Sequence, residues 1–373
     1  MEPFGLKTAL PEGRKESGPE HQRGVPAPGV AMPRRVKSLI GLDVGTRAVK
    51  AVELTWNGGP VITGFGRAEL PSPDAVPDTV QRILRDNEFH TRRVVSSVSG
   101  KAVIVRYLTM YKMSPEDLRN AIRYEADKYI PFDVDEVVLD CQPFEADGVG
   151  DLAPNEMRVL LVACKRAVIY EQLRILAGAG LHPEIVDVDV FALGNAFETS
   201  VRRGPEAAAR VSALVDVGAS KTSVNLIRAG TSLFTREIHA GGDAFTVAIA
   251  NRLGLKQGEA ETLKQRPGQD LERVRTAVTP AVDDLAAEIR LSFEYFENQF
   301  DMGIDEVLLS GGGSRLSGLD QDLARIFDRP TTTWDPTGDL PIAAGSVDVE
   351  SLRERMSELA VAVGLASRVR RNG

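Results

Sequence analysis

Apolar residues recur along the chain with two periods, one of two residues and one of about 3.6 residues. From residue 39 onward, short apolar runs predict strands, and stretches with apolar residues three or four positions apart predict helices. The first two runs, 39–44 and 48–54, flank Gly45-Thr46 and predict a hairpin. Further strands are expected at 61–68, 93–99, 102–108, 134–144, 156–164 and 307–310.

Helices are expected where the apolar period is helical. Ser114 has the features of an N-cap, because Pro115 and Asp117 follow at positions that favour the first turn. Pro131 should end this helix, since proline has no N–H to donate. The other predicted helices are 78–87, 167–179, 244–253, 257–264, 280–300 and 349–369.

The second half of the chain repeats the pattern of the first. Residues 212–225 form a second predicted strand–turn–strand unit, in which Asp216 aligns with Asp43 and Gly218 with Gly45. Two similar units far apart in one sequence indicate a duplicated domain. A chain of 373 residues is long enough for two or three domains.

The first 37 residues differ in composition from the rest. They combine prolines, glycines and charges of both signs with few large apolar residues, so they cannot offset the entropy lost on ordering. We expect this tail to be disordered. Met32 precedes the first strand closely and is a second candidate for the native start, which the N-terminal mass would decide.

Composition and charge exclude several classes of protein. Lysine and arginine number 45 against 53 aspartates and glutamates, so the chain has no overall positive field to attract nucleic acid. Apolar runs stay well below the roughly 18–20 residues needed to span a bilayer, and the start lacks the apolar core of a signal peptide. Cys141 and Cys164 fit no metal spacing and are expected to be buried thiols rather than a disulfide.

Three glycine-containing segments follow predicted strands and have the composition of phosphate-binding turns. In Asp43-x-Gly45 and Asp216-x-Gly218, a carboxylate at a strand end can hold magnesium, and the glycine lets backbone amides approach a phosphate. The third segment is Gly311-Gly312-Gly313, followed by Arg315. A tight hairpin or loop would explain each alone, so their order and separation carry the argument.

In this order the segments resemble the phosphate-1, phosphate-2 and adenosine motifs of the actin-like ATPases. That superfamily includes actin, the seventy-kilodalton heat-shock chaperone, sugar kinases, MreB and FtsA. The resemblance covers residues 39 to about 368. It implies an α/β actin-like ATPase fold with two lobes, a duplicated core and an FtsA-type subdomain inserted in lobe one.

The same resemblance implies how the chain divides. A disordered tail at 1–37 precedes a lobe-one core at 38–91 and 167–210, with the inserted subdomain at 92–166. The lobe-two core would then be 211–240 and 301–373, and a nucleotide-covering subdomain would occupy 241–300.

The resemblance further implies ATP and Mg²⁺ between the lobes, with Asp43 and Asp216 as metal ligands. Lys50 either faces the phosphates or is a solvated strand residue, and Arg315 either lines the adenine or lies on a surface helix. The nucleotide-binding residues that the resemblance implies are Gly45, Thr46, Lys50, Gly218, Ala219, Ser220, Lys221, Thr222, Gly241, Gly242, Glu261, Lys264, Gly312, Gly313 and Arg315.

Turnover of ATP is expected to be slow or absent. Actin-like sites place a water-positioning group in lobe one, and by position this group is Asp187 or Asp189. Asp189 stands where relatives often carry glutamate, which is one methylene longer. We therefore take Asp189 as the candidate catalytic residue and expect it to leave the attacking water poorly placed.

One branch of the superfamily fits best. Residues 125–132 (EADKYIPF), followed by 137–140 (VVLD), are similar to the signature of the PilM family of type IV pilus assembly proteins, and 185–189 and 290–296 also match its pattern. The resemblance implies a cytoplasmic ATP-binding scaffold at the inner face of the cytoplasmic membrane. It would dock an N-terminal cytoplasmic peptide of the membrane protein PilN and meet motor or platform components of the pilus machine.

No nucleic-acid partner is expected, and contact with the membrane would be indirect. Self-association stays open. In the region that the family uses near its inserted subdomain, Tyr129, Ile130 and Phe132 are expected to build or buttress the peptide groove. The basic residues Arg123 and Lys128 would steer an acidic partner.

Three alternatives were weighed against this family. An FtsA-like filament protein would end in an amphipathic membrane helix, whereas residues 367–373 are short and polar. A small-molecule kinase would need a substrate pocket and catalytic aspartate that the sequence does not reveal. The cytoplasmic domain of a type II secretion protein would continue into a transmembrane helix. The sequence leaves the pilus subtype and filament formation undecided.

Overall fold

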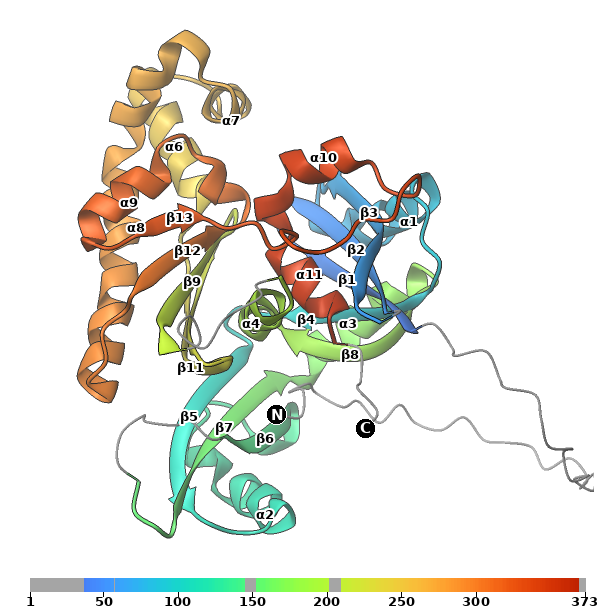
Figure 1. The fold of residues 1–373 in the computed structure, drawn as a ribbon, viewed down its shortest axis with the longest axis vertical. Coiled ribbons are helices and arrows are strands. Elements are labelled where there is room, and N and C mark those ends of the chain that lie inside the picture. Colours follow the sequence, from blue (N-terminus) through green and yellow to red (C-terminus); the bar gives the residue numbers. More distant parts are fainter. Residues whose placement is uncertain (1–36, 57, 145–151, 201–208, 369–373) are drawn as a thin grey trace, which may run out of the picture.

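The computed structural model describes residues 37–56, 58–144, 152–200 and 209–368. Figure 1 shows two α/β lobes side by side, with a smaller three-stranded subdomain that extends from the junction between them. The predicted tail lies outside the described residues, except for Lys37, which begins the first strand.

Lobe one is built on a five-stranded sheet of order β3-β2-β1-β4-β8. Its first three strands form an antiparallel meander, and the last two add in parallel beside β1. The hairpin and the third strand predicted from the apolar runs are therefore confirmed. The strands are β1 (Lys37–Val44), β2 (Ala48–Trp56), β3 (Pro60–Glu69), β4 (Arg93–Val98) and β8 (His182–Val188).

Lobe two is built on a second five-stranded sheet of order β11-β10-β9-β12-β13, which repeats the arrangement of lobe one. Asp43 pairs with Lys50 across the first hairpin, and Asp216 pairs with Ser223 across the equivalent one. The duplication predicted from the sequence is confirmed. The strands are β9 (Val211–Val217), β10 (Thr222–Arg228), β11 (Thr231–Ile238), β12 (Glu306–Ser310) and β13 (Thr331–Thr333).

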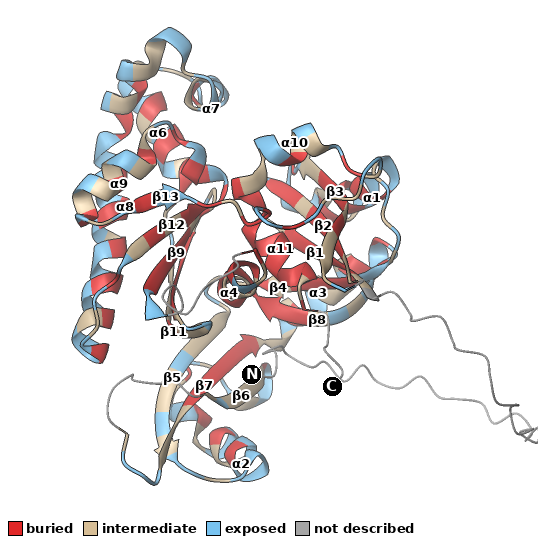
Figure 2. Cartoon of the chain, viewed as in Figure 1, coloured by how far each residue is buried: buried red, intermediate tan, exposed pale blue. Residues whose placement is uncertain are grey.

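Helices cover both faces of the lobe-one sheet. Because successive side chains of a strand point to opposite faces, Ile40 packs with α1 (Val76–Asp86) and α3 (Arg166–Gly178), whereas Leu39 packs with α4 (Asp189–Ser200) and α11 (Ala360–Ala366). The core around α4 and α11 also takes in lobe-two residues, and in Figure 2 these two helices lie at the junction of the lobes with largely buried surfaces. The two lobes therefore share one apolar layer.

Among the described residues, four α-helices accompany the sheet of lobe two. They are α6 (Gly242–Leu253), α7 (Gln257–Gln265), α8 (Leu271–Phe300) and α9 (Leu319–Phe327). The sequence predicted that α8 begins at Pro280, which is wrong, because the helix continues through this proline. An interior proline removes one backbone hydrogen bond, and burial of Val274, Ala277 and Val278 in the lobe-two core on the preceding turns compensates for it.

The inserted subdomain is a three-stranded sheet of order β5-β7-β6 with one helix. Its elements are β5 (Val103–Tyr111), α2 (Pro115–Glu125), β6 (Val137–Phe144) and β7 (Glu156–Lys165). The Ser114 side chain accepts a hydrogen bond from the Asp117 N–H, so the predicted N-cap is confirmed. The sheet packs on α2 with one face and on the start of α4 with the other.

The structure differs from the expected division of the chain in two places. β4 falls within 92–166, yet it pairs with β1 and β8 and belongs to the lobe-one sheet, so the insertion starts after it. The segment after β13 does not belong to the lobe-two core, because α11 packs on β1 and α4. The predicted single helix at 349–369 is broken into α10 (Val349–Glu354), a 3₁₀ turn η6 (Met356–Leu359) and α11.

None of the helices formed by the described residues is both long and apolar enough to cross a membrane. Cys141 and Cys164 are free thiols, as predicted, but only Cys164 is fully buried and Cys141 is partly exposed. Burial raises the pKa of each to about 11.

Candidate functional site

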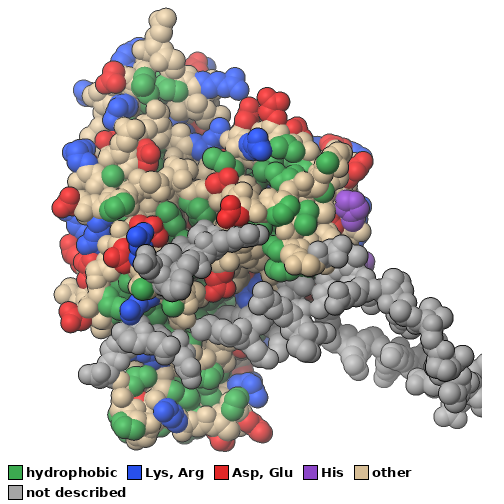
Figure 3. Space-filling model, viewed as in Figure 1, with side chains coloured by type: hydrophobic (Ala, Val, Ile, Leu, Met, Phe, Trp, Pro, Cys, Tyr) green, Lys and Arg blue, Asp and Glu red, His purple; other side chains and the backbone are tan. Residues whose placement is uncertain are grey.

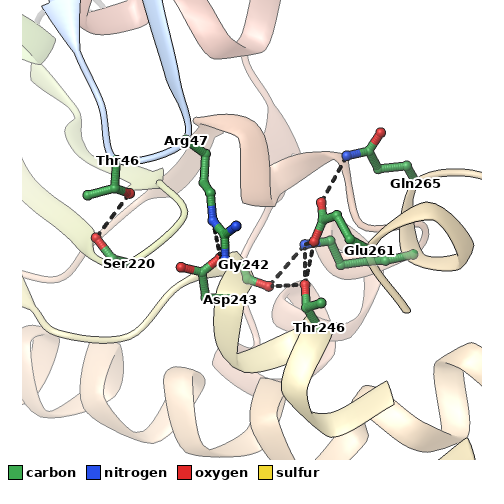
Figure 4. Close-up of polar contacts among 9 residues, drawn as sticks. Thr46, Arg47, Ser220, Gly242, Asp243, Thr246, Glu261 and Gln265 are labelled. Carbon is green, nitrogen blue, oxygen red and sulfur yellow. Dashed lines mark hydrogen bonds and ion pairs between the residues drawn. The ribbon is translucent and has the colours of Figure 1, made fainter. Parts of the chain in front are cut away.

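The turns of the two repeated hairpins meet where the lobes face each other. Thr46, in the β1–β2 turn, donates a hydrogen bond from its Oγ1 to the Oγ of Ser220 in the β9–β10 turn, at 3.3 Å. Figure 4 shows this contact at one end of a row of polar residues drawn from both lobes. In Figure 3 the surface is notched between the upper parts of the two lobes. The predicted phosphate-binding turns are thus brought together from distant parts of the sequence.

Asp43 is the penultimate residue of β1 and is paired with Lys50 of β2. The Lys50 Nζ lies 2.7 Å from Asp43 Oδ2, and both side chains are largely buried. Burial by itself would lower the pKa of Lys50, but the charge of Asp43 and the hydrogen bond between the two raise it overall. Lys50 is therefore a fixed cation at the end of the first hairpin rather than a solvated strand residue.

Asp216 occupies the equivalent place at the end of β9. Ser310, its parallel neighbour on β12, donates a hydrogen bond from Oγ to Asp216 Oδ1 at 2.8 Å. Burial is the main cause that raises the pKa of Asp216 to about 6, and the negative charges of Asp43 and Asp189 add to it. A carboxylate kept near its titration point by burial and like charges favours a cation beside it.

Glycine backbones pack closely around the second turn. A Cβ on Gly241 would lie 2.6 Å from the Gly218 carbonyl oxygen, and a Cβ on Gly313 would lie 2.5 Å from Val217 Cγ1. Gly311 has a φ of 86°, which favours glycine, and passes equally close to Val217. Only glycine permits these approaches, so two separate segments, at Gly241 and at 311–313, converge on the second turn.

A second polar cluster lies further along the same row, on α6 and α7. Lys264 Nζ donates to Glu261 Oε2 at 2.7 Å, to Thr246 Oγ1 at 2.8 Å and to the Gly242 carbonyl oxygen at 3.0 Å. Gln265 donates to the other oxygen of Glu261 at 2.8 Å (Figure 4). The predicted residues Glu261 and Lys264 are therefore adjacent, and each orients the other beside Gly242.

Lys221 does not point freely into the site. Its Nζ lies 2.6 Å from Asp189 Oδ2 and 3.2 Å from Glu237 Oε2. Burial opposes the charged lysine, but the two carboxylates raise the pKa of Lys221 overall. Burial also opposes the charge of Asp189, yet Lys221 and the hydroxyls of Ser97 and Ser99 lower its pKa. Asp189 is thus an ionised carboxylate engaged by a lysine, which makes it a weak base.

Asp187, the other carboxylate considered for water positioning, is buried away from this row. It accepts a 2.6 Å hydrogen bond from Arg368 Nε, and the side chains are 0% and 4% exposed. Of the two aspartates considered, Asp189 is the one paired with a residue of the β9–β10 turn.

Arg315 follows the glycine-rich segment and contacts Glu358 of η6, with Nη1 2.6 Å from Oε1. Glu358 also pairs with Arg67 of β3 and Arg355. Burial would raise the pKa of Glu358, but the nearby guanidinium groups lower it to about 2. This carboxylate consequently joins arginines from both lobes, and Arg315 is oriented by it.

Five further predicted residues, Thr222, Gly45, Gly218, Gly312 and Ala219, have structural places within or beside the turns. Thr222 is buried and donates its hydroxyl to the Ala240 carbonyl oxygen at 2.7 Å. Gly45 and Gly218 form their turns by donating N–H groups to the carbonyl oxygens of Ala48 and Lys221, at 3.0 and 2.9 Å. Gly312 lies between Gly311 and Gly313 in the converging loop, and Ala219 accepts from the N–H of Asp243 at 2.8 Å.

Arg47 belongs to the same row and was missed from the sequence. Its guanidinium contacts the carboxylate of Asp243, the second residue of α6, from across the junction of the lobes (Figure 4). The signal was available, because Arg47 directly follows the predicted turn Gly45-Thr46.

Asp43 and Asp216 could hold Mg²⁺ only together with a phosphate-bearing ligand. Magnesium in nucleotide sites takes one or two carboxylates and completes its shell with phosphate oxygens and water. Asp43 and Asp216 offer that number of carboxylates. Across the described ranges, no three His, Cys, Asp or Glu side chains converge to hold a metal by themselves, so a phosphate-bearing ligand would have to supply further ligands.

The candidate partner residues cluster at the end of α2. Ile130 is buried in the core of the inserted subdomain. Tyr129 donates from its hydroxyl to Glu125 at 3.3 Å, and Phe132 has the Lys165 ammonium 4.6 Å from its ring centre. Tyr129 and Phe132 are partly exposed, so Ile130 can only support a surface that the other two form.

A family model described as type IV pilus assembly protein PilM matches residues 41–370. The chain belongs to the PilM family. Among solved structures, a chain of the "PilM-PilN type IV pilus biogenesis complex" is 31% identical, with a TM-score of 0.78, and the match covers 88% of this chain and 98% of that one. The PilM family assignment was predicted from residues 125–140 and is confirmed.

A more distant structure shares the fold. The ethanolamine utilization protein EutJ from Carboxydothermus hydrogenoformans is 14% identical with a TM-score of 0.54, and the match covers 91% of each chain. The protein has the actin-like ATPase fold predicted from its sequence motifs. The family match favours PilM over the FtsA-like and kinase alternatives.

Proposed function

We propose that the protein is an ATP-binding scaffold of a type IV pilus assembly machine, which docks the N-terminal cytoplasmic peptide of a PilN-like membrane protein. Membership of the PilM family and the likeness to a chain of a PilM–PilN complex support the scaffold role. The protein would act at the inner face of the cytoplasmic membrane through that partner. Contacts with motor or platform components and self-association remain predictions.

The nucleotide part of the proposal rests on one observation, the convergence of two Asp-x-Gly turns and a glycine-rich loop. At the second turn the backbones approach so closely that Gly241, Gly311 and Gly313 leave no room for a Cβ. The first turn is joined to the second by the hydrogen bond between Thr46 and Ser220. Such turns present amide groups to phosphates. The proposed ATP would lie along the polar row of Figure 4, with phosphates at the turns and the sugar and base near Glu261 and Lys264.

Hydrolysis, if any, is expected to be slow. The Lys221 ammonium forms an ion pair with Asp189, the candidate water-positioning group, and lowers the pKa of its carboxyl. A carboxylate whose pKa is lowered removes a proton from water less readily. This physical reason for slow turnover adds to the short reach of aspartate.

Asp216 should govern the magnesium dependence of ATP binding. We expect Asp216→Ala and Asp216→Asn to bind ATP no better with Mg²⁺ than without it, because the buried carboxylate that would receive the metal is gone. Calorimetry at equal protein concentration, with and without Mg²⁺, measures this. Unchanged magnesium dependence in both variants would remove the role assigned to Asp216.

The same measurement has a pH signature. A proton on Asp216 excludes the metal, so the magnesium-dependent affinity of the wild-type protein should fall as the pH drops through about 6, the raised pKa of Asp216. Asp216→Asn should show no such step. The folding stability of the protein without metal depends on pH in the opposite direction. Because the pKa of Asp216 is higher in the folded than in the unfolded protein, the folded protein binds more protons, and its stability falls as the pH rises toward 6.

Phe132 should contribute to binding of the PilN-like peptide. Phe132→Ala is expected to weaken that binding by at least about 1 kcal/mol, the usual threshold for an important interface residue, and to leave ATP affinity unchanged. Titration of a labelled PilN-like N-terminal peptide measures it. Tyr124→Ala is the matched control, because Tyr124 lies on α2 of the same subdomain and is 90% exposed. Equal peptide binding in Phe132→Ala, Tyr129→Ala and wild type would place the peptide elsewhere.

A further inference from the structure

Arg47 and Asp243 form an ion pair between the lobes, in the middle of the polar row. Arg47 Nε and Nη2 each lie 3.1 Å from Asp243 Oδ1. Figure 4 shows the pair between the Thr46–Ser220 contact on one side and the Glu261 cluster on the other. The pair thus spans the path along which the proposed nucleotide would run from its phosphates to its base.

Arg47 differs from the other cations of the row in its exposure. Its side chain is 65% exposed and that of Asp243 is 36% exposed. Water-exposed ion pairs contribute little to stability, so this one breaks at low cost. The other cations are less exposed and each has a carboxylate partner: Lys50 with Asp43, Lys221 with Asp189, Lys264 with Glu261 and Arg315 with Glu358.

A phosphate chain is a better partner for this guanidinium than Asp243. Arginine matches phosphate oxygens with a planar fork of N–H donors, and charge-assisted hydrogen bonds of this kind are among the strongest that side chains form. Both contacts of Arg47 go to a single oxygen of Asp243, so that pair does not use the fork fully. The Asp243 carboxylate would also repel the phosphates of a nucleotide beside it.

We propose that Arg47 exchanges Asp243 for the phosphate chain when a nucleotide binds, and that Asp243 competes with the phosphates for this arginine. This inference rests on the proposed ATP-binding function. It makes Arg47 a phosphate ligand that the motif alone does not specify. It also requires the two members of one ion pair to act on nucleotide affinity in opposite directions.

The test compares Arg47→Ala with Asp243→Asn by calorimetry with ATP, ADP and adenosine in the presence of Mg²⁺. Arg47→Ala should bind ATP and ADP about tenfold more weakly, since a charge-assisted contact is lost. Asp243→Asn should bind both about threefold more tightly, since competition and repulsion are removed. Adenosine carries no phosphate and should bind equally to the wild type and both variants.

Several outcomes would overturn the inference. If both variants weaken ATP binding to a similar extent, the pair is a structural bridge or Asp243 helps to hold the metal. An unchanged ATP affinity in Arg47→Ala, or an equal loss for adenosine, would also overturn it. Thermal unfolding without nucleotide controls for folding, and Arg47→Gln serves as a second variant that retains more of the side chain.

The same titrations separate this inference from the proposed function. Wild-type protein that binds ATP, together with an Arg47→Ala variant that binds it equally well, overturns the role of Arg47 alone. Wild-type protein that binds no ATP overturns both.

Discussion

Gly364→Ala is expected to destabilise the protein severely. A Cβ at this position of α11 would lie 1.7 Å from the carbonyl oxygen of Ala192 and 3.0 Å from the Ala196 nitrogen, both in α4. These are backbone atoms, so no side-chain rotation can relieve the clash, and the helices must separate. Overpacking a core typically costs about 1–3 kcal/mol, and we expect a loss at or above the top of that range.

The midpoint of thermal unfolding and the soluble yield measure this effect. Gly258→Ala is the matched control, because Gly258 lies in α7 with no atom within 4 Å of the added Cβ. It should stabilise its helix by roughly 0.5–1 kcal/mol, since glycine costs more conformational entropy than alanine. A Gly364→Ala protein as stable as the wild type would contradict the close packing of α11 on α4.

Arg368→Met should produce the second large loss. Arg368 forms a 2.6 Å ion pair with Asp187, and both side chains are almost completely removed from water. Without the arginine, the Asp187 carboxylate keeps, among the described residues, the hydrogen bond from the Val188 N–H. Breaking one side of a buried ion pair costs about 3–5 kcal/mol, because the remaining charge has no compensation.

Chemical denaturation of the single and double variants measures this. Arg368→Met combined with Asp187→Asn should recover part of the stability lost in Arg368→Met alone, since the double variant has no buried charge. Arg123→Met is a control of the same chemistry at the surface, because Arg123 and Asp135 are 68% and 81% exposed and 3.4 Å apart. A double variant no more stable than Arg368→Met would show that lost packing, not the unpaired charge, dominates.

Much of the fold could be predicted because its local signals agree. Short apolar runs on both sides of Gly45-Thr46 predicted the first hairpin, and Ser114 predicted the start of α2. The assignment of strands to sheets was less accessible. β4 has the same apolar character whether it joins the lobe-one sheet or the insertion, and only its pairing with β1 and β8 decides.

The candidate site was predictable where a motif fixes the backbone and less so where side chains meet over long distances. The two Asp-x-Gly turns can be recognised from the sequence alone. The partner of Lys221 cannot be recognised in this way, because Asp189 belongs to the other lobe. Arg47 was missed for the same reason, since its importance depends on Asp243, which lies nearly two hundred positions further along the chain.

Lobe one is assembled from both ends of the described chain, and this has a consequence for how the protein is made. Its sheet begins at Lys37, but α11, which covers Leu39, Val52 and Leu54, consists of residues 360–366. The sheet and α4 are synthesised long before α11, so the part of this face that α11 covers lacks its partner until residues 360–366 follow. The apolar layer on this face of lobe one can therefore be completed only after the last described helix has been made. A chain truncated before α11 would lack this cover over Leu39, Val52 and Leu54.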